Sequence, residues 1–307
     1  KTDFGDVHVD VGFRYEHQKA ETENDTQDSA KHNLFAFSLG TIYSYSDGYE
    51  TGFNASRTER APTIEELFAS GGHLATNTFE IGDADLDEET SNNFDIFWRK
   101  TSGRLRLDVS FFYNMVDDFV YLALNDGNNN GVADRVEADF LETGEIHDDE
   151  EDELLLVNQS QTDADFWGFE LAGDWNFFDD QRGRLDMRMW SDWVEGELDD
   201  GSNVPRMTSA RFGSSLSYML GPWDMSFRLT HVFDQNDTAE LETETDGYTL
   251  LNLYASYTWA LANDNEISVF AHGKNLADEE IRRHTSFVKD ISTLAGVSGL
   301  FGIRAKF

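Results

Sequence analysis

The feature that most constrains the fold is an alternation of apolar and polar side chains with a period of two residues, which recurs along almost the whole chain. The segment 7–15 is typical, because Val, Phe or Tyr occupies every odd position and polar residues or Gly occupy the positions between. Side chains two residues apart lie on the same face of an extended strand. Helical periodicity is almost absent. The pattern therefore predicts an all-β protein with about twelve strands, each near the ~9–11 residues that cross a bilayer when tilted.

The connectors between these strands alternate between very short and long. The short ones carry the Gly, Asp and Asn that tight hairpins need, and they occupy residues 46–48, 101–103, 179–183, 220–222 and 262–266. The long ones occupy roughly residues 18–32, 58–88, 125–153, 196–206, 234–246 and 275–296. Strict alternation gathers every long loop at one end of the sheet. Short turns at one end and long loops at the other are typical of an antiparallel transmembrane β-barrel.

Charge follows the same division. The chain carries 60 acidic and 23 basic residues, a net charge of −37, so it lacks the basic face that nucleic-acid binding needs, and no nucleic-acid partner is expected. Half of the acids, 30 of 60, lie in five segments without a single Lys or Arg. These segments are residues 21–30, 80–89, 137–153, 195–200 and 234–246. One rim of the predicted barrel is therefore strongly anionic.

Alternation alone does not say which face meets water, so a soluble β-sandwich or propeller remains an alternative. The chain ends on Phe307 of an alternating strand, as outer-membrane barrels typically do. The absence of Cys excludes disulfides, thiol nucleophiles and Cys-based zinc or iron–sulfur sites. No run of about 18 apolar residues predicts a transmembrane helix. The chain opens without Met, and we expect it to be part of a longer polypeptide with any signal peptide upstream.

Several motifs resemble the barrel of a TonB-dependent receptor. The most specific is the run from Arg60 to Asn93, which opens Arg-Ala-Pro-Thr-Ile-Glu-Glu-Leu-Phe. Further matches lie at residues 112–118, 163–170, 204–206, 247–252 and 274–278 and at Phe307. Within that family, residues 73–80, 240–246 and 282–290 are similar to the branch that imports zinc.

The resemblance implies a barrel of roughly 22 strands closed around an N-terminal plug. Residues 1–307 would form one unit, about the twelve C-terminal strands, with the plug and the TonB box outside this chain. The implied partners are the TonB complex, through that missing N-terminal region, outer-membrane lipid and the barrel-assembly machinery. The implied location is the outer membrane of a Gram-negative bacterium, and the implied function is import of a scarce metal, with zinc as the expected cargo. A ferric siderophore or haem receptor is the alternative within this class, and a calcium-binding surface adhesin is the alternative outside it.

Zinc without Cys must be bound by His nitrogens and carboxylate oxygens. Histidines beside acids in the long loops are therefore the candidate ligands, and an anionic rim would concentrate the ion before capture. The candidates are His73 with Glu80, His147 with Asp148, His231 and His284. The alternative for each is an ordinary solvated loop residue.

One loop matches the twelve-position calcium pattern. Oxygen-bearing side chains occupy positions 1, 3, 5, 9 and 12, a Gly occupies position 6, and position 7 supplies a carbonyl. The residues are Asp126, Asn128, Asn130, Gly131, Val132, Asp134 and Glu137. Because no flanking helices are predicted, the expectation is a calcium-stiffened loop. The alternative is a polar hairpin loop rich in Asn and Gly.

The polar face of the strands carries basic and acidic residues in alternation, which predicts cross-strand ion pairs that line the lumen and hold the plug. They are Arg14, Arg99, Arg106, Arg188, Arg228 and Arg304 with Asp10, Asp95, Asp108, Asp186 and Asp224. No G-x-S-x-G, H-E-x-x-H or Gly-rich phosphate loop appears, so no enzyme is expected.

Overall fold

The computed structural model describes residues 5–21, 29–127, 129–137, 140–146 and 153–307. Twelve long strands form one antiparallel path in which each strand pairs with the next long strand of the chain. They are β1 (Asp6–Glu21), β2 (Ser29–Ser46), β3 (Tyr49–Arg60), β6 (Glu89–Lys100), β7 (Leu105–Leu124), β9 (Leu154–Asp180), β10 (Gly183–Leu198), β11 (Arg211–Leu220), β12 (Trp223–Val232), β13 (Tyr248–Ala260), β14 (Glu266–Lys274) and β15 (Ser298–Lys306). The all-β prediction is confirmed.

Smaller elements lie in the long loops. Three short strands attach to β9 or to each other: β4 (Ser70–His73), β5 (Thr78–Ile81) and β8 (Arg135–Val136). The helical elements are α1 (Ile64–Phe68), α2 (Phe140–Thr143) and the 3₁₀ turn η1 (Ala262–Asp264). None of the helices in the described part of the chain is long and apolar enough to cross a membrane.

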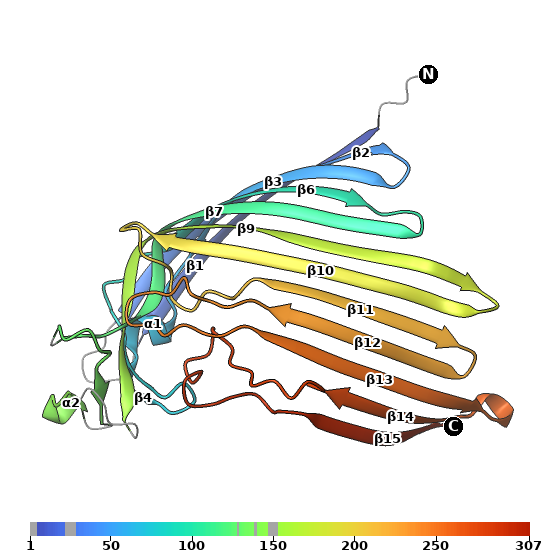
Figure 1. Ribbon diagram of the computed structural model, residues 1–307. Helices are drawn as coiled ribbons and strands as arrows, with labels where there is room; N and C mark the ends of the chain where they lie inside the picture. Colours follow the sequence, from blue (N-terminus) through green and yellow to red (C-terminus); the bar gives the residue numbers. More distant parts are fainter. Residues whose placement is uncertain (1–4, 22–28, 128, 138–139, 147–152) are drawn as a thin grey trace.

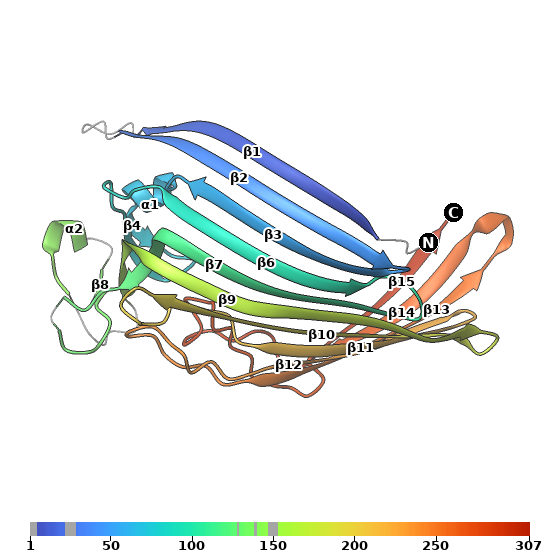
Figure 2. The same cartoon turned by 90° about the horizontal axis from the view of Figure 1, so that it is seen from above.

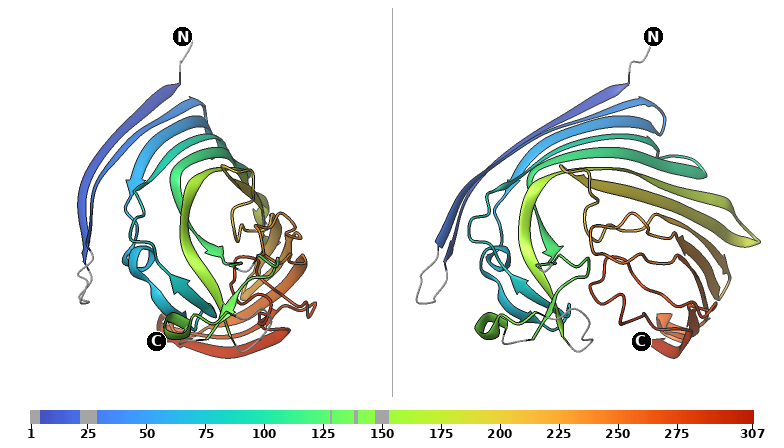
Figure 3. Two further views of the ribbon diagram at one scale, coloured as in Figure 1. Left: turned by 90° about the vertical axis from the view of Figure 1, so that its left-hand side faces the viewer. Right: turned by 60° about the vertical axis from the view of Figure 1, so that its left-hand side comes forward.

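The two ends of the sheet differ as the connector lengths predict. The five tight hairpins lie together at what we call the turn end, on the right of Figure 1. The long connections gather at the opposite end, which we call the loop end, and the view from above repeats this division (Figure 2). The sheet curves round so that β1 and β15 form its two rims (Figure 3). Within the described residues, each of these two strands pairs on one side only, so the curved sheet is open between them.

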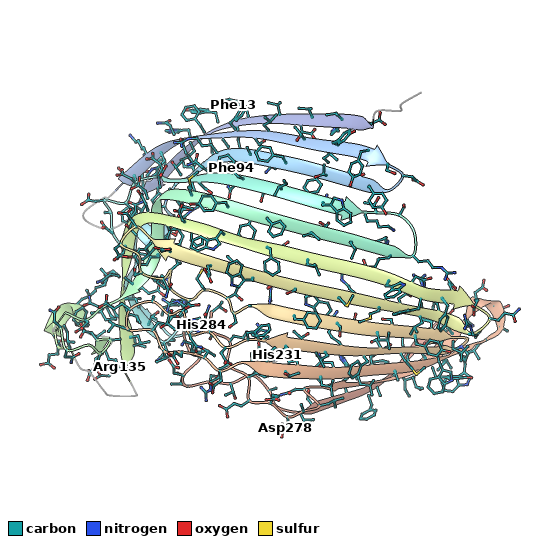
Figure 4. All side chains as sticks on the ribbon, turned by 45° about the horizontal axis from the view of Figure 1, so that its top comes forward. Phe13, Phe94, Arg135, His231, Asp278 and His284 are labelled. Carbon is teal, nitrogen blue, oxygen red and sulfur yellow. The ribbon has the colours of Figure 1, made fainter. Side chains whose placement is uncertain are left out.

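The alternating apolar side chains of the long strands are exposed, and within the described residues no second sheet packs against them. Phe13 is 73% exposed and Val11 is 68% exposed, and Figure 4 shows Phe13 and Phe94 standing clear of the strands. Buried apolar residues form four small clusters among the loops and strand ends at the loop end, around Phe79, Leu67, Leu198 and Ile281. A soluble sandwich would bury the apolar face of its strands. Hydrocarbon is therefore the solvent for the outer face, as in a membrane barrel.

Aromatic side chains mark the turn end of this apolar band. The indole of Trp98 donates a hydrogen bond to the Tyr45 hydroxyl at 2.8 Å, and the Tyr49 ring lies 6.0 Å from the Trp98 ring. On the later strands the Trp223 and Tyr257 rings lie 4.9 Å apart. Such amphipathic rings collect at the interface between lipid and water.

The polar face carries cross-strand ion pairs, but within the described residues Arg99 with Asp108 is the one pair that joins two of the residues predicted from the alternation. Arg99 donates to Asp108 at 2.8 Å. Arg106 instead faces Asp174, 3.8 Å away. Glycines on this face lie directly opposite aromatic side chains of the neighbouring strand, and the register pairs Gly52 with Phe97, Gly168 with Phe112, Gly213 with Trp190 and Gly302 with Phe270. Each ring occupies the space that a Cβ at the glycine would need.

Candidate functional site

The candidate site is the mouth formed by the long loops at the loop end. Its first loop is fixed by the motif that starts at Arg60. The guanidinium of Arg60 donates to Glu66 at 2.8 Å and to Glu89 at 2.9 Å, so it joins the start of the loop to the strand that follows it. Thr63 and Glu66 form a capping box at the start of α1. These residues are structural supports for the loop and do not present free ligands.

His73 and Glu80 lie on the β4–β5 hairpin of this loop. The Nδ1 atom of His73 lies 3.1 Å from Oε1 of Glu80, and the Thr78 hydroxyl donates to the same oxygen at 2.9 Å. The two candidate ligands of this hairpin therefore lie in contact with each other. The hairpin is anchored by Phe79, which is fully buried, and β5 pairs in parallel with β9. The His73 ring itself is more than half exposed.

His284 is buried and bridges two loops. Its Nε2 lies 3.3 Å from Oε1 of Glu242, and its Nδ1 lies 2.7 Å from the Thr245 hydroxyl. The His284 and Glu242 side chains are 1% and 4% exposed. Glu242 also accepts hydrogen bonds from the backbone N–H groups of Arg206, at 3.1 and 3.2 Å, and of Ala239, at 3.2 Å. The pair acts as a tie between loops, with no open face for an ion.

The electrostatics of Glu242 agree with this role. Burial by itself would raise the pKa of the carboxyl. The contact with His284 and the hydrogen bonds from the two backbone N–H groups outweigh burial, so the pKa lies below its ordinary value of 4.5. The carboxylate is therefore charged at neutral pH.

His231 lies in the wall and not in a loop. It belongs to β12, its Nδ1 lies 2.9 Å from the Thr249 hydroxyl, and its ring packs edge-on against Phe233 (Figure 4). His147 and Asp148 fall outside the described residues. Across the described ranges, no three His, Asp or Glu side chains are grouped so that they could hold a metal ion. The structure therefore brings His73 and Glu80 into contact but does not bring the described zinc candidates of different loops together.

The described residues of the predicted calcium loop, 126–127 and 129–137, lie between the end of β7 and the end of β8. The Asp126 carboxylate accepts hydrogen bonds from the backbone N–H groups of Asn130 and Gly131, both at 2.9 Å, and the Asn130 side chain accepts one from Val132 at 2.8 Å. Asp134 is fully buried. Glu137 does not join Asp126 and Asp134 in a group of three carboxylates. Asn128 lies outside the described residues.

A pocket of about 310 Å³ lies in the mouth, between the β7–β8 turn and the loops that follow β10, β12 and β14. Three basic side chains line it, Arg135, Arg206 and Lys289, together with two acidic ones, Glu242 and Asp290, and the aromatic ring of Phe287. The guanidinium carbon of Arg206 lies 3.4 Å from the centre of the Phe287 ring, a cation–π contact. Sequence reasoning missed this pocket. Its only signal was a few isolated basic residues between acidic segments.

Burial alters the chemistry of these cations. It lowers the pKa of Arg206, which nearby Glu242 only partly offsets, and it lowers the pKa of Lys289, which Asp290 and Glu242 partly offset. Lys289 is 5% exposed and its Nζ donates to the Thr243 hydroxyl at 2.6 Å. Arg206 donates to the Leu122 carbonyl at 3.3 Å and has a left-handed backbone, with φ of 56°. Partly desolvated cations of this kind favour an anionic ligand.

Comparisons with known proteins agree with the architecture. The family described as "TonB dependent receptor-like, beta-barrel" matches residues 2–276. Among solved structures, the copper transporter OprC has a TM-score of 0.75 at 14% identity, over 97% of this chain and 44% of that one. The FrpB iron transporter from Neisseria meningitidis (F3-3 variant) has a TM-score of 0.66 at 12% identity, over 98% and 43%.

The ferric citrate transporter FecA, in its unliganded form, has a TM-score of 0.67 at 15% identity, over 99% of this chain and 43% of that one. The chain thus spans less than half the length of these transporters. At these identities, the likeness to each of them is one of fold. The chain belongs to the TonB-dependent receptor-like β-barrel family and is an outer-membrane protein of a Gram-negative bacterium.

Proposed function

We propose that the whole protein imports a scarce metal across the outer membrane in the form of an anionic metal chelate, which is captured at the basic pocket of the mouth. The observation that carries the proposal is the convergence of Arg135, Arg206 and Lys289 on one pocket of about 310 Å³. These three bases outnumber the two acids of the pocket, Glu242 and Asp290, so its net charge favours an anion over a bare divalent cation. Carboxylate or catecholate oxygens that wrap a metal would pair with them, and Phe287 would contact the organic part of the chelate.

The charge around the pocket and the family of the chain support how capture and import would occur. Acidic residues crowd the loop-end rim, and an anion would approach it against long-range repulsion, so short-range pairing in the partly buried pocket supplies the affinity. Family membership supports energy input through TonB, acting on an N-terminal plug inside the closed barrel. Outer-membrane lipid and the barrel-assembly machinery are the other expected partners. The structural neighbours named above are transporters of copper, iron and ferric citrate, which supports metal as the cargo.

Free zinc is the second candidate cargo. It is favoured by the exposed His73–Glu80 pair, which offers one imidazole and one carboxylate at the rim. Further ligands would have to come from movement of the loops, because the described zinc candidates lie on separate elements. The two cargoes require different residues of the mouth. The chelate would bind the basic side chains of the pocket, whereas zinc would bind His and carboxylate ligands.

Binding titrations of the full-length protein with ferric citrate and with ZnCl₂ distinguish the chelate from free zinc as the cargo. We expect Arg206→Gln and Lys289→Gln each to weaken ferric citrate binding at least tenfold, because each removes a charged hydrogen-bond donor from the pocket. Arg283→Gln is the matched control, since Arg283 is an exposed base of the same loop and should leave binding unchanged. Equal ferric citrate affinity in all four proteins would contradict the chelate proposal. Tight zinc binding that is lost on His73→Ala would favour zinc.

A further inference from the structure

We propose that Asp126 and Asp134 are the charged ligands of a resident Ca²⁺ site between β7 and β8. The observation that points to an ion is Asp134. Its side chain is fully buried, yet only one of its two oxygens is satisfied: Oδ2 accepts a hydrogen bond from the Gly127 N–H at 2.7 Å, and Oδ1 has no hydrogen-bond partner. Buried carboxylates in proteins are paired with a base or coordinate a metal.

No basic side chain supplies that pairing within the described residues. The adjacent base, Arg135, directs its guanidinium to the Glu153 carbonyl, 3.0 Å away. None of the ion pairs in the part of the chain that the structure describes involves Asp134. A cation bound from solution would neutralise the buried charge and satisfy the free oxygen at the same time.

The turn around Asp134 is rich in oxygen atoms. Gly127, whose N–H binds Asp134, directly follows Asp126, so the two carboxylates belong to one turn. A Cβ at position 127 would lie 3.3 Å from Asn125 Oδ1 and 3.3 Å from Asp134 Oδ2, so both oxygens face the backbone of this glycine. Gly131 has φ of 85°, which allows the sharp bend that the sequence pattern requires.

The donor set selects calcium over other ions. The available ligands are carboxylate, amide and carbonyl oxygens in an irregular loop, which suit Ca²⁺, whereas Zn²⁺ prefers nitrogen or sulfur and Mg²⁺ requires a near-ideal octahedron. Because Glu137 does not join the two aspartates, the site has only two carboxylates, and water must complete the coordination. The expected dissociation constant is therefore in the range of extracellular modules, about 10⁻⁴–10⁻³ M.

The ion would stabilise one wall of the mouth. Gly131, Val132, Ala133 and Arg135 line the basic pocket. Directly after Asp134, β8 pairs with β9, and Val136 packs in the buried cluster with Phe79. Calcium bound at Asp126 and Asp134 would thus order the pocket wall from one side and the β4–β5 hairpin from the other. This role is independent of which cargo the protein imports.

The test is calorimetric titration of the full-length, detergent-solubilised protein with CaCl₂ after EGTA treatment, in about 0.15 M KCl to screen the acidic rim. We expect one saturable site, whose affinity falls at least tenfold in Asp126→Asn and in Asp134→Asn. Asp199→Asn, an exposed acid of another mouth loop, is the matched control and should bind as the wild type does. Absence of a saturable site in the wild type, or wild-type affinity in both variants, would overturn the proposal.

A second measurement separates loss of the ion from loss of the fold. In EGTA, Asp134→Asn should unfold at a higher temperature than the wild type, because it removes an unpaired buried charge. CaCl₂ should raise the unfolding temperature of the wild type but not of this variant. Hydrogen exchange at the amides of Gly131 and Val132 should slow on calcium addition in the wild type only. Unchanged exchange at these amides in the wild type would contradict the site even if the variants fail to fold.

Discussion

At the scale of single residues, Glu242 shows how the mouth is held together. Its carboxylate contacts a buried imidazole and accepts hydrogen bonds from the backbone N–H groups of Arg206 and Ala239, and these partners lie up to 42 positions from Glu242 in the sequence. Hydrogen bonds to a charged acceptor contribute about 1.5–3 kcal/mol each. Glu242 is therefore a better explanation for the local order of the three loops than any single apolar contact among them.

Glu242→Gln should raise hydrogen exchange at the amides of Arg206 and Ala239 by about tenfold or more, since about 1.4 kcal/mol corresponds to a factor of ten. The wild type should show a pH dependence that the variant lacks. The folded-state pKa of Glu242 lies below its ordinary value of 4.5, so its contribution is complete above pH 4.5 and is lost as the pH falls through the folded-state value. Amide hydrogen exchange at Arg206 and Ala239 is measured from pH 7 downward and corrected for the intrinsic exchange rate at each pH. It checks both the effect of the substitution and the pH dependence of the wild type. Equal protection in the variant would remove Glu242 from this role.

At the scale of strands, the pairing of glycine with an aromatic ring across neighbouring strands shapes the polar face. At Gly213 an added Cβ would lie 2.0 Å from the Trp190 ring, whereas at Gly40 the nearest atom, Asn54 Oδ1, would be 3.7 Å away. The two glycines lie on the same kind of strand but differ in what covers them. The rings lie flat across the sheet because the opposite residue has no side chain.

Gly213→Ala should destabilise the barrel by about 1–3 kcal/mol, because the indole must leave its position to admit the methyl group. Gly40→Ala, the matched control, should change stability by no more than about 0.5 kcal/mol. Unfolding in urea after insertion into lipid vesicles measures both. If the two variants unfold at the same urea concentration, the ring at Trp190 is not packed as described.

At the scale of the whole molecule, the fold depends on hydrocarbon wetting one face of the sheet and water the other. Substitutions at Ile96 and Ser110, which lie on the neighbouring strands β6 and β7, test which face meets hydrocarbon. Ile96 is 55% exposed on the apolar face, and Ser110 lies on the polar face beside Arg99 and Asp108. A soluble protein of the same topology would bury the first and solvate the second.

Ile96→Arg should therefore destabilise the protein in a bilayer by about 2–4 kcal/mol, the cost of a charge near the membrane midplane. Ser110→Arg introduces the same side chain into the polar lumen and should be tolerated. The fraction of protein that folds into vesicles, read from its heat-sensitive mobility on a gel, measures the difference. Equal folding of the two variants would mean that the apolar face does not meet lipid.

The sequence by itself determined the strands, their two faces and the division into a turn end and a loop end. All three depend on short-range information, since alternation acts between residues two apart and hairpin turns within a few residues. The pairing of His73 with Glu80 was also predictable, because a short hairpin joins them. The place of His231 beside a long loop also follows from the sequence, since the predicted loop begins at residue 234 and β12 ends at Val232.

Only the tertiary structure decided which loop residues meet. Arg206 bonds to Leu122, 84 positions away, and Lys289 bonds to Thr243, 46 positions away. Such contacts depend on the path of each irregular loop over the mouth, which no periodicity encodes. For the same reason the His-and-acid pattern correctly marked the mouth but did not gather a metal site. The basic pocket arises because the curvature of the sheet brings the ends of non-adjacent strands to one opening, where a few cations lie close together.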